Sequence, residues 1–301
     1  MPEYKELRLI AIYMYISKLY ESELQYTCQR FSNNNSPEFT DQEVLTIYLF
    51  VITQQQYFQI TQIYKFADEY MRSWFPKLPS YAAFNNRLNR LSEALRVLVT
   101  GLFESFIPDD CDLHISLTDS MPIVTCKGKN KKAKVATELV DKGYCSTKNM
   151  YYFGLKLHLL AFRRPGTIPF PEFVGITPAS ENDLTAFKNL YGDYICNRVI
   201  FGDKIFSDEP YFKIKLTEQN IEMLTPVKLA KGEPERIRQR EKAFRDLYSA
   251  AVSTIRQPVE SFFNWLNEKT KIQDAQKVRS SKWLAVHVFG KIAATFIFLI
   301  F

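Results

Sequence analysis

The spacing of hydrophobic and polar positions along this chain changes near residue 107. Before that point, apolar side chains recur every three or four positions, as they do on amphipathic helices. One predicted helix begins at Thr40, which can form a capping box with Glu43. Another begins at Ser80 and continues to residue 106, with an apolar side made of Phe84, Leu88, Leu91, Leu95 and Leu98. The N-terminal third is therefore predicted to be helical.

The segment Ile107–Asp112 marks the predicted boundary, and short runs rich in β-branched, aromatic and leucine residues follow it, as is typical of strands. Five strands are predicted, at residues 113–119, 151–162, 171–178, 198–203 and 221–227. Helices are predicted at residues 181–194 and 207–219, from residue 233 and from residue 254. This order predicts an α/β fold, a mixed five-stranded sheet flanked by helices and preceded by a helical N-terminal domain. The predicted domains are residues 1–110 and residues 111–301.

Three acidic residues of the second domain stand where a carboxylate is costly to bury without a function. Asp119 ends the first predicted strand, and Asp203 ends the fourth. Glu260 falls in the first turn of a helix, because Pro258 is tolerated only there. That helix has an apolar side made of Val259, Phe262, Phe263 and Leu266.

These acids suggest a chemistry. Mg²⁺ prefers hard oxygen ligands, and a pair of such ions activates the attacking oxygen and stabilises the leaving one in phosphoryl transfer. The sequence therefore predicts Asp119, Asp203 and Glu260 as metal-binding catalytic residues for Mg²⁺, with Mn²⁺ as an alternative. The competing interpretation is three unrelated surface carboxylates.

Four segments carry a resemblance to a known family: TDSMPIVTC (118–126), YYFGLKLHLL (151–160), FGDKIF (201–206) and IRQPVESFFNWL (255–266). The chain resembles the DDE transposases of bacterial insertion sequences, in particular insertion-sequence family 982. The resemblance implies a ribonuclease H-like catalytic domain that acts on the ends of its own element. It also implies that Asp119, Asp203 and Glu260, separated by 84 and 57 residues, are the metal-binding triad.

The resemblance further implies partners and a location. The expected substrate is double-stranded DNA, both the terminal inverted repeats and the target, and a homodimer or larger assembly is expected when two ends are paired. The expected location is the bacterial cytoplasm, next to the nucleoid. Many relatives carry a lysine seven positions after the glutamate, where this chain has Asn267; the nearest lysines are Lys269 and Lys271.

Basic residues are concentrated in the second predicted domain. The net charge is +6, with −3 in residues 1–110 and +9 in residues 111–301, which suggests a polyanionic partner. The candidate DNA contacts are Arg87, Arg90, Lys127, Lys129, Lys131, Lys132, Arg256, Lys269 and Lys271.

Each group of these contacts has an alternative. The lysines of 127–148 could belong to a solvated loop, and Arg87 and Arg90 to an ordinary solvated helix face. Arg256 could pair with Glu260 instead of a phosphate. Nearby, Tyr144, Tyr151 and Tyr152 could stack on exposed bases or pack in the core or at an edge strand.

Several classes of protein are disfavoured. Five scattered cysteines without a CxxC pair, and three dispersed histidines, predict neither a disulfide framework nor a histidine-based metal site. Residues 283–301 are apolar enough to be considered as a membrane span, but they include His287 and Lys291, so a buried terminal helix and no membrane partner are expected.

The predicted function is thus metal-dependent DNA cleavage and strand transfer at element ends. Two alternatives stay open at this point. One is a nuclease that cuts by the same chemistry and never joins ends, and the other is an inactive, domesticated DNA-binding protein.

Overall fold

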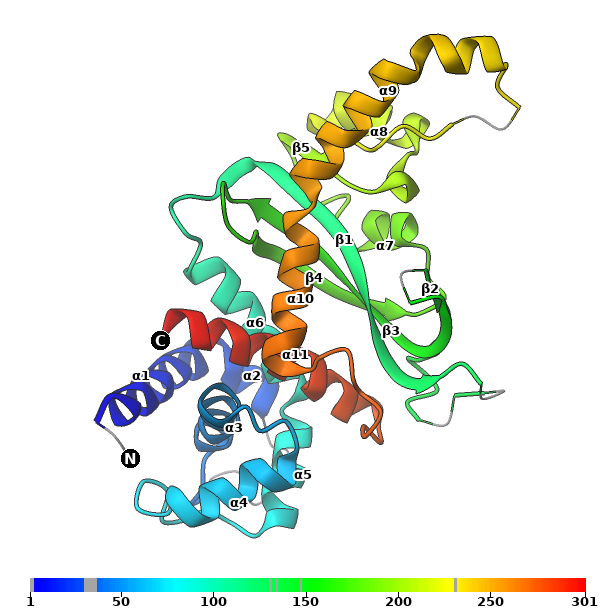
Figure 1. The fold of residues 1–301 in the computed structure, drawn as a ribbon. Coiled ribbons are helices and arrows are strands. Elements are labelled where there is room, and N and C mark those ends of the chain that lie inside the picture. Colours follow the sequence, from blue (N-terminus) through cyan, green and yellow to red (C-terminus); the bar gives the residue numbers. More distant parts are fainter. Residues whose placement is uncertain (1–2, 30–36, 130–131, 134, 147, 230–231) are drawn as a thin grey trace. The chain divides into compact units, whose positions relative to one another are not determined.

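The chain forms two compact units in the computed structural model, which describes residues 3–29, 37–129, 132–133, 135–146, 148–229 and 232–301 (Figure 1). Unit 1 comprises Met1–Phe106, Lys134–Glu138 and Leu266–Phe301. Unit 2 comprises Ile107–Ala133 and Leu139–Trp265. The division predicted from the sequence had assigned all residues after 110 to one domain, whereas by contact the last 36 residues group with the N-terminal helices.

Unit 1 is helical. Its elements are α1 (Glu3–Leu19), the π-helical turn η1 (Tyr20–Leu24), α2 (Gln25–Cys28), α3 (Asp41–Gln55), α4 (Ile60–Tyr70), α5 (Tyr81–Arg90), α6 (Ser92–Ser105), the C-terminal part of α10 (Pro258–Thr270) and α11 (Ser281–Ile300). The predicted capping box is present at the start of α3, with the Glu43 amide donating to Thr40. The helix predicted from Ser80 to residue 106 is instead two helices, α5 and α6, with a break at Leu91.

Helix α11 lies in the core of unit 1 and packs against α6 and α3. By length and composition it could cross a membrane, the single helix of this kind among the residues described, but 67% of its apolar window is buried inside the protein. The Tyr48 hydroxyl of α3 donates to the Val286 carbonyl of α11 at 3.3 Å. The apolar C-terminal segment is thus a buried helix, as the sequence predicted.

Unit 2 is built on a mixed sheet of six strands: β1 (Asp112–Lys127), β2 (Asp141–Cys145), β3 (Met150–Arg163), β4 (Phe170–Pro178), β5 (Arg198–Phe201) and β6 (Ile221–Leu224). The order is β2-β3-β1-β5-β6, and β4 pairs with β3. Strands β2 and β4 share one edge of β3, because β2 pairs with residues 150–154 and β4 with residues 155–162. Strands β5 and β6 run parallel to β1.

Two features of this sheet differ from the prediction. The prediction had five strands, and the additional one is β2, which lies within the segment expected to be a lysine-rich loop. The first strand was predicted to end at Asp119, but β1 continues for eight more residues to Lys127 because β3 pairs with it along this whole length.

The helices of unit 2 are α7 (Asp183–Leu190), the short 3₁₀ turn η2 (Lys204–Phe206), α8 (Glu209–Gln219), α9 (Glu235–Arg256) and the first residues of α10. Helices α7 and α8 bury an aromatic and aliphatic cluster against β5 and β6; its members include Phe187, Ile200, Phe206, Phe212 and Ile221. Helix α9 extends beyond the sheet (Figure 1). It ends at Arg256, and α10 begins at Pro258 after a one-residue break, which places Glu260 in its first turn as predicted.

Candidate active site

The register of two parallel strands places Asp119 and Asp203 next to each other. The last parallel pair between β1 and β5 is Leu117 with Phe201. Asp119 and Asp203 each lie two residues beyond that pair, at the point where β5 ends and η2 begins. The two carboxylates are close enough that the charge of Asp203 raises the pKa of Asp119. The strand-end argument therefore holds for Asp203, whereas Asp119 is in the middle of a 16-residue strand, just past the end of its partner.

Arg256, the last residue of α9, connects two of the predicted acids. Its Nη1 donates to Oδ2 of Asp119 at 2.6 Å, and its Nη2 donates to Oε1 of Glu260 at 2.6 Å. The Arg256 side chain is largely buried, whereas that of Glu260 is 55% exposed. The sequence left two interpretations of Arg256, a phosphate contact and an ion pair with Glu260. The structure shows the ion pair with Glu260 and a second one with Asp119.

The Asp119 carboxylate is in an unusual electrostatic environment. Burial raises its pKa to about 6, against the opposing effects of the Arg256 guanidinium and of the Ser120 amide, which donates to Oδ1 at 2.8 Å. The negative charges of Asp203 and Asp183 raise this pKa further. Desolvation and like charges both disfavour ionisation, so this site carries more negative charge than it has cations to neutralise.

Opposing effects also act on the pKa of the Asp203 carboxylate. Burial raises its pKa, while the Ile205 amide, at 2.8 Å from Oδ1, and the positive charge of Arg256 lower it. The charge of Asp183 raises it again. One oxygen of Asp203 thus caps the η2 turn, while the carboxylate still interacts electrostatically with Arg256 and Asp183.

Asp183 is a further acid near Asp119 and Asp203, and it was not among the predicted site residues. It is the first residue of α7, and its Oδ1 accepts hydrogen bonds from the Ser120 hydroxyl and from Nζ of Lys156, each at 3.0 Å. The Ser120 backbone amide in turn holds Asp119. The sequence places Asp183 in the first turn of a helix, where acids are common because they suit the helix dipole, so nothing local distinguished it from a solvated residue.

His158 belongs to the same neighbourhood and is structural. Its Nε2 lies 2.7 Å from the Thr177 hydroxyl, and burial lowers its pKa to about 4.

Comparison with known proteins identifies the family. A model of the transposase DDE domain matches residues 111–297, which is more than half of the chain. The chain belongs to this transposase DDE family. Comparisons with curated proteins and with solved structures gave no match. Membership makes the chain a nucleic-acid-cleaving enzyme of the transposase type, with DNA as its substrate.

The matched DDE domain contains the predicted lysines that follow Asp119 in the sequence. Lys127, at the end of β1, and Lys129 and Lys132, after it, are exposed. Lys131 lies outside the described residues. The exposed lysines are therefore available to a ligand from solvent, as a phosphate contact requires.

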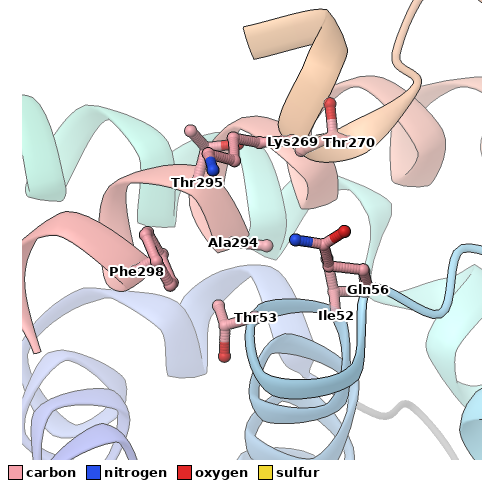
Figure 2. Close-up of a pocket in the computed structure, with 8 residues that line it drawn as sticks. All are labelled: Ile52, Thr53, Gln56, Lys269, Thr270, Ala294, Thr295 and Phe298. Carbon is pink, nitrogen blue, oxygen red and sulfur yellow. The ribbon is translucent and has the colours of Figure 1, made fainter. Parts of the chain in front are cut away.

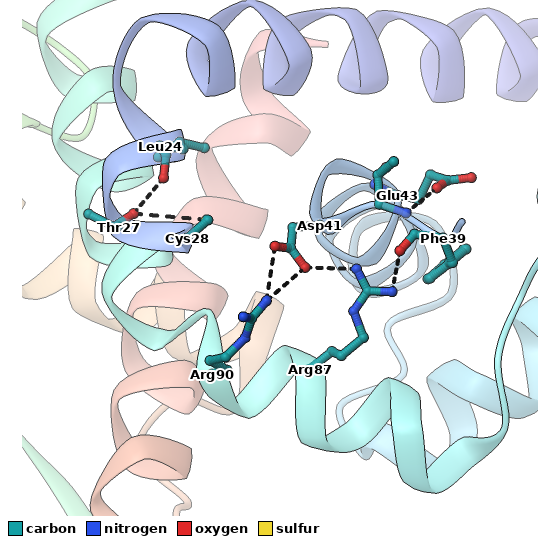
Figure 3. A network of polar contacts seen from close by, with 9 residues as sticks. Leu24, Thr27, Cys28, Phe39, Asp41, Glu43, Arg87 and Arg90 are labelled. Atoms are coloured by element: carbon teal, nitrogen blue, oxygen red, sulfur yellow. Dashed lines mark hydrogen bonds and ion pairs between the residues drawn. The ribbon is translucent and has the colours of Figure 1, made fainter. Parts of the chain in front are cut away.

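The predicted contacts Arg87 and Arg90 are engaged inside unit 1 (Figure 3). Both guanidinium groups bind the Asp41 carboxylate at the start of α3, Arg87 at 2.8 Å and Arg90 at 3.0 Å. Arg87 also donates to the Phe39 carbonyl. The Asp41 side chain is only 4% exposed. We therefore assign these arginines to the packing of α5 against α3 and leave them out of the proposed DNA surface.

Lys269 and Lys271 lie at the end of α10, in unit 1. Lys269 lines a small pocket with Phe298 and residues of α3 and α11, and its ammonium is 5.8 Å from the centre of the Phe298 ring (Figure 2). The other lining residues are Ile52, Thr53, Gln56, Thr270, Ala294 and Thr295, none of them acidic. Lys271 is exposed and has a left-handed backbone with φ of 53°.

The donor set of the DDE site suits a divalent metal, on which transposase DDE domains generally depend. In the part of the chain that the structure describes, no three His, Cys, Asp or Glu side chains stand together at metal-binding distances. The acids are nevertheless hard oxygen donors, and the pKa values of Asp119 and Asp203 are raised by burial and by nearby like charges. A divalent cation would relieve this excess of negative charge, a task that Arg256 performs in part here.

Proposed function

We propose that this protein is a DNA transposase that cleaves the ends of its insertion sequence and transfers the cut strand to target DNA. The observation that carries the proposal is that one guanidinium, that of Arg256, bonds to Asp119 and Glu260. Its charge also lowers the pKa of Asp203. The parallel β1–β5 pairing and the long antiparallel β1–β3 pairing are consistent with a ribonuclease H-like sheet. The motifs around the acids support a place in insertion-sequence family 982.

In this proposal, Asp119, Asp203 and Glu260 hold Mg²⁺, or Mn²⁺ in its place. The bound ions would supply an activated attacking oxygen and stabilise the leaving oxygen of a phosphodiester. Asp119 is fixed on the rigid β1 strand, Asp203 by its bond to the Ile205 amide, and Glu260 on the first turn of α10. Ser120 and Asp183 orient Asp119 from the other side of β1.

Arg256 has two consecutive roles in this scheme. Without DNA it neutralises Asp119 and Glu260, which would otherwise repel each other. If a metal ion neutralised the acids in its place, the guanidinium would be able to bind two phosphate oxygens bidentately, for which its planar fork is well suited. Exposed Lys127, Lys129 and Lys132 would neutralise further phosphates on the same substrate.

The proposed substrates are the terminal inverted repeats and a double-stranded target. Because two ends are joined to one target, we further propose a homodimer or larger assembly on DNA, acting in the bacterial cytoplasm at the nucleoid. A protein with these roles needs a basic DNA surface, to which the exposed Lys127, Lys129 and Lys132 of unit 2 would contribute.

The test is Asp119→Asn, assayed on double-stranded DNA that carries the sequence flanking the gene. This change keeps the shape and removes a ligand charge, so strand cleavage with Mg²⁺ should fall by about 10³-fold or more, as it does when members of a catalytic set that acts as a unit are removed. Asp193→Asn is the matched control, because Asp193 is an exposed acid of unit 2 that pairs with Lys215. Metal-dependent cleavage by Asp119→Asn at the rate of the control would refute the assignment.

A second assay decides between transposase and nuclease. Pre-cut ends with a free 3′-hydroxyl are supplied with a target plasmid, and joined products are measured. A protein that cleaves and joins is a transposase, whereas cleavage without joining would establish the nuclease alternative. Absence of both activities in the unmodified protein would favour the inactive DNA-binding alternative.

A further inference from the structure

Two exposed tyrosines form an aromatic pair at the edge of the sheet of unit 2. Tyr144 of β2 and Tyr151 of β3 are directly opposite each other in the antiparallel register. Their ring centres are 5.0 Å apart with an interplanar angle of 54°. The two residues are 49% and 59% exposed, whereas Tyr152, the next residue of β3, is buried on the other face. Of the three tyrosines considered in the sequence, one is therefore a core residue and two are at the surface.

The pair is held in position by polar contacts. The Tyr144 hydroxyl donates to Oδ1 of Asn149 at 2.6 Å. The Lys142 ammonium lies 5.0 Å from the centre of the Tyr151 ring, a cation–π contact. Among the residues that the structure describes, β2 is the edge strand in the order of the sheet, and no further strand pairs with its outer side. A fixed pair of half-exposed rings loses little conformational freedom when a flat ligand stacks on it.

Positive charge surrounds this aromatic pair. The Gly128 amide donates to the Tyr151 carbonyl at 2.8 Å, which brings Lys127 and Lys129, both exposed, next to the pair. A side chain at Gly128 would meet the Tyr151 backbone at 2.5 Å, so only glycine permits this approach. The acid nearest in sequence is Asp141, which accepts a hydrogen bond from the Ser180 hydroxyl. Aromatic rings among lysines match the two parts of a nucleotide, base and phosphate.

The pair also faces the same side of the sheet as the candidate active site. Leu159 is the partner of Asp119, and Tyr151 lies eight residues earlier on β3. Because side chains of a strand alternate, an even separation places Tyr151 on the face to which Asp119 belongs. At the usual rise per residue, the two positions are about 26 Å apart along the strand, or about eight base pairs of B-form DNA.

We propose that Tyr144 and Tyr151 form a stacking platform for an unpaired nucleobase of the DNA substrate, with Lys142, Lys127 and Lys129 binding the neighbouring phosphates. The proposal rests on the proposed function for its identification of DNA as the ligand. It adds a site away from the three acids, and a substrate form, locally unpaired DNA, that those acids do not specify. Stacking on aromatic side chains tolerates any base, because every base has a π-face.

The test compares two fluorescein-labelled probes of equal length, a deoxythymidine oligonucleotide and an abasic oligonucleotide with the same phosphates. The full-length protein is expected to bind the thymidine probe more tightly. In the double variant Tyr144→Leu, Tyr151→Leu, affinity for the thymidine probe should fall by about 5- to 100-fold, to the level of the abasic probe. Affinity for the abasic probe should stay nearly unchanged.

Three further variants test whether the rings, the lysine charge or a general loss of surface tyrosine explains the change in affinity. Tyr144→Phe with Tyr151→Phe should retain base-dependent binding, because the rings remain. Lys142→Gln should weaken binding of both probes and reduce its salt dependence. Tyr194→Leu is the matched control: it is a 77% exposed tyrosine of unit 2 outside the pair, and its removal should change neither affinity.

The proposal is overturned if the unmodified protein does not distinguish the two probes, or if the folded leucine variant loses affinity for both equally. Failure of the proposed function has a different signature. The protein could bind the thymidine probe in a base-dependent way, lose this binding in the leucine variant, and yet cleave no DNA. That result would support the stacking platform and refute the proposed enzymatic function.

Discussion

Lys291 of α11 is buried in unit 1, where its charge is expensive. Its Nζ donates to the Lys271 carbonyl at 3.2 Å and lies 5.4 Å from the centre of the Phe58 ring. Desolvation lowers its pKa to about 7, opposed by the charge of Asp274. One turn earlier, His287 bonds to the Ile272 carbonyl at 2.8 Å, and burial and the Lys291 charge lower its pKa to about 3.

We predict that Lys291→Met stabilises the protein in a pH-dependent manner. Below pH 7 the lysine is charged in both states, and the folded state bears the full cost of burial. As pH rises from 7 to the unfolded pKa near 10.5, the folded state alone loses its proton and that cost disappears. The free energy of unfolding should therefore rise by about 1–4 kcal/mol in the variant at pH 6, and this gain should vanish near pH 10.5.

Urea denaturation of both proteins between pH 6 and pH 10 measures this gain. The pKa of His287, followed by NMR, gives an independent check, since removal of the neighbouring positive charge should raise it. A gain of the same size at every pH would show that packing, and not the charge of Lys291, is responsible.

Individual residues also show what the sequence could and could not predict about the site. Asp203 and Glu260 could be recognised because a strand end and a proline-started helix leave local signals. Asp119 was also predicted as the end of a strand, and this was wrong, because β1 continues to Lys127. The Arg256 bridge and Asp183 depend on the packing of α9 and α7 on the sheet, which no local pattern encodes.

Among the elements, α3 and α5 are joined by one buried carboxylate. Asp41 lies at the first turn of α3, and Arg87 and Arg90, one turn apart on α5, both bind it (Figure 3). The two arginines neutralise a side chain that has almost no access to water. Removal of the shared partner would leave two cations facing each other at the joint between the helices.

We predict that Asp41→Ala lowers the free energy of unfolding by about 3 kcal/mol, the lower end for a buried pair, because Arg90 is partly exposed and can reach water. The matched control is Asp68→Ala, which removes the exposed pair with Arg72 on α4 and should cost less than about 1 kcal/mol. Urea denaturation of both variants provides the comparison. Equal effects would mean that the Asp41 cluster is no more than a surface ion pair.

The same joint explains one difference between sequence and structure at this scale. Arg87 and Arg90 occupy polar positions in the pattern, which predicted a DNA contact or a solvated face. The acid that they bind lies 46 and 49 residues earlier in the chain. Likewise, β2 was hidden within a run of lysines, because an edge strand can be polar and needs only backbone pairing with β3. Long apolar elements such as β3, α3 and α11 were predicted well, because their many apolar residues indicate that they are buried.

At the scale of the whole molecule, segments that are far apart in the sequence share one core. Helix α11 is part of the core of unit 1 together with the N-terminal helices. Helix α11 packs on α3 and α6, and at Gly290 it lies against the Tyr48 side chain of α3. A Cβ at Gly290 would lie 2.6 Å from the Tyr48 ring and hydroxyl. Sequence patterns could predict that this segment is buried, but not which segment covers it, because 238 residues separate Tyr48 from the Val286 carbonyl that it bonds.

We therefore predict opposite effects for two glycine-to-alanine changes in helices of unit 1. Gly290→Ala should lower the free energy of unfolding by about 2 kcal/mol, because the clash with Tyr48 outweighs the gain in helix propensity. Gly101→Ala in α6 should be neutral or stabilising by up to about 1 kcal/mol, since its Cβ would lie 3.3 Å from the flexible Leu19 side chain and 3.8 Å from the Tyr15 hydroxyl. Hydrogen exchange then locates the effect. Faster exchange in α3, α6 and α11 of Gly290→Ala, with β1 and β3 still protected, is expected if the two units unfold separately. Equal loss of protection in both units would show instead that the chain unfolds as one cooperative body, in which the fit of α11 against Tyr48 also supports the sheet that bears the three acids.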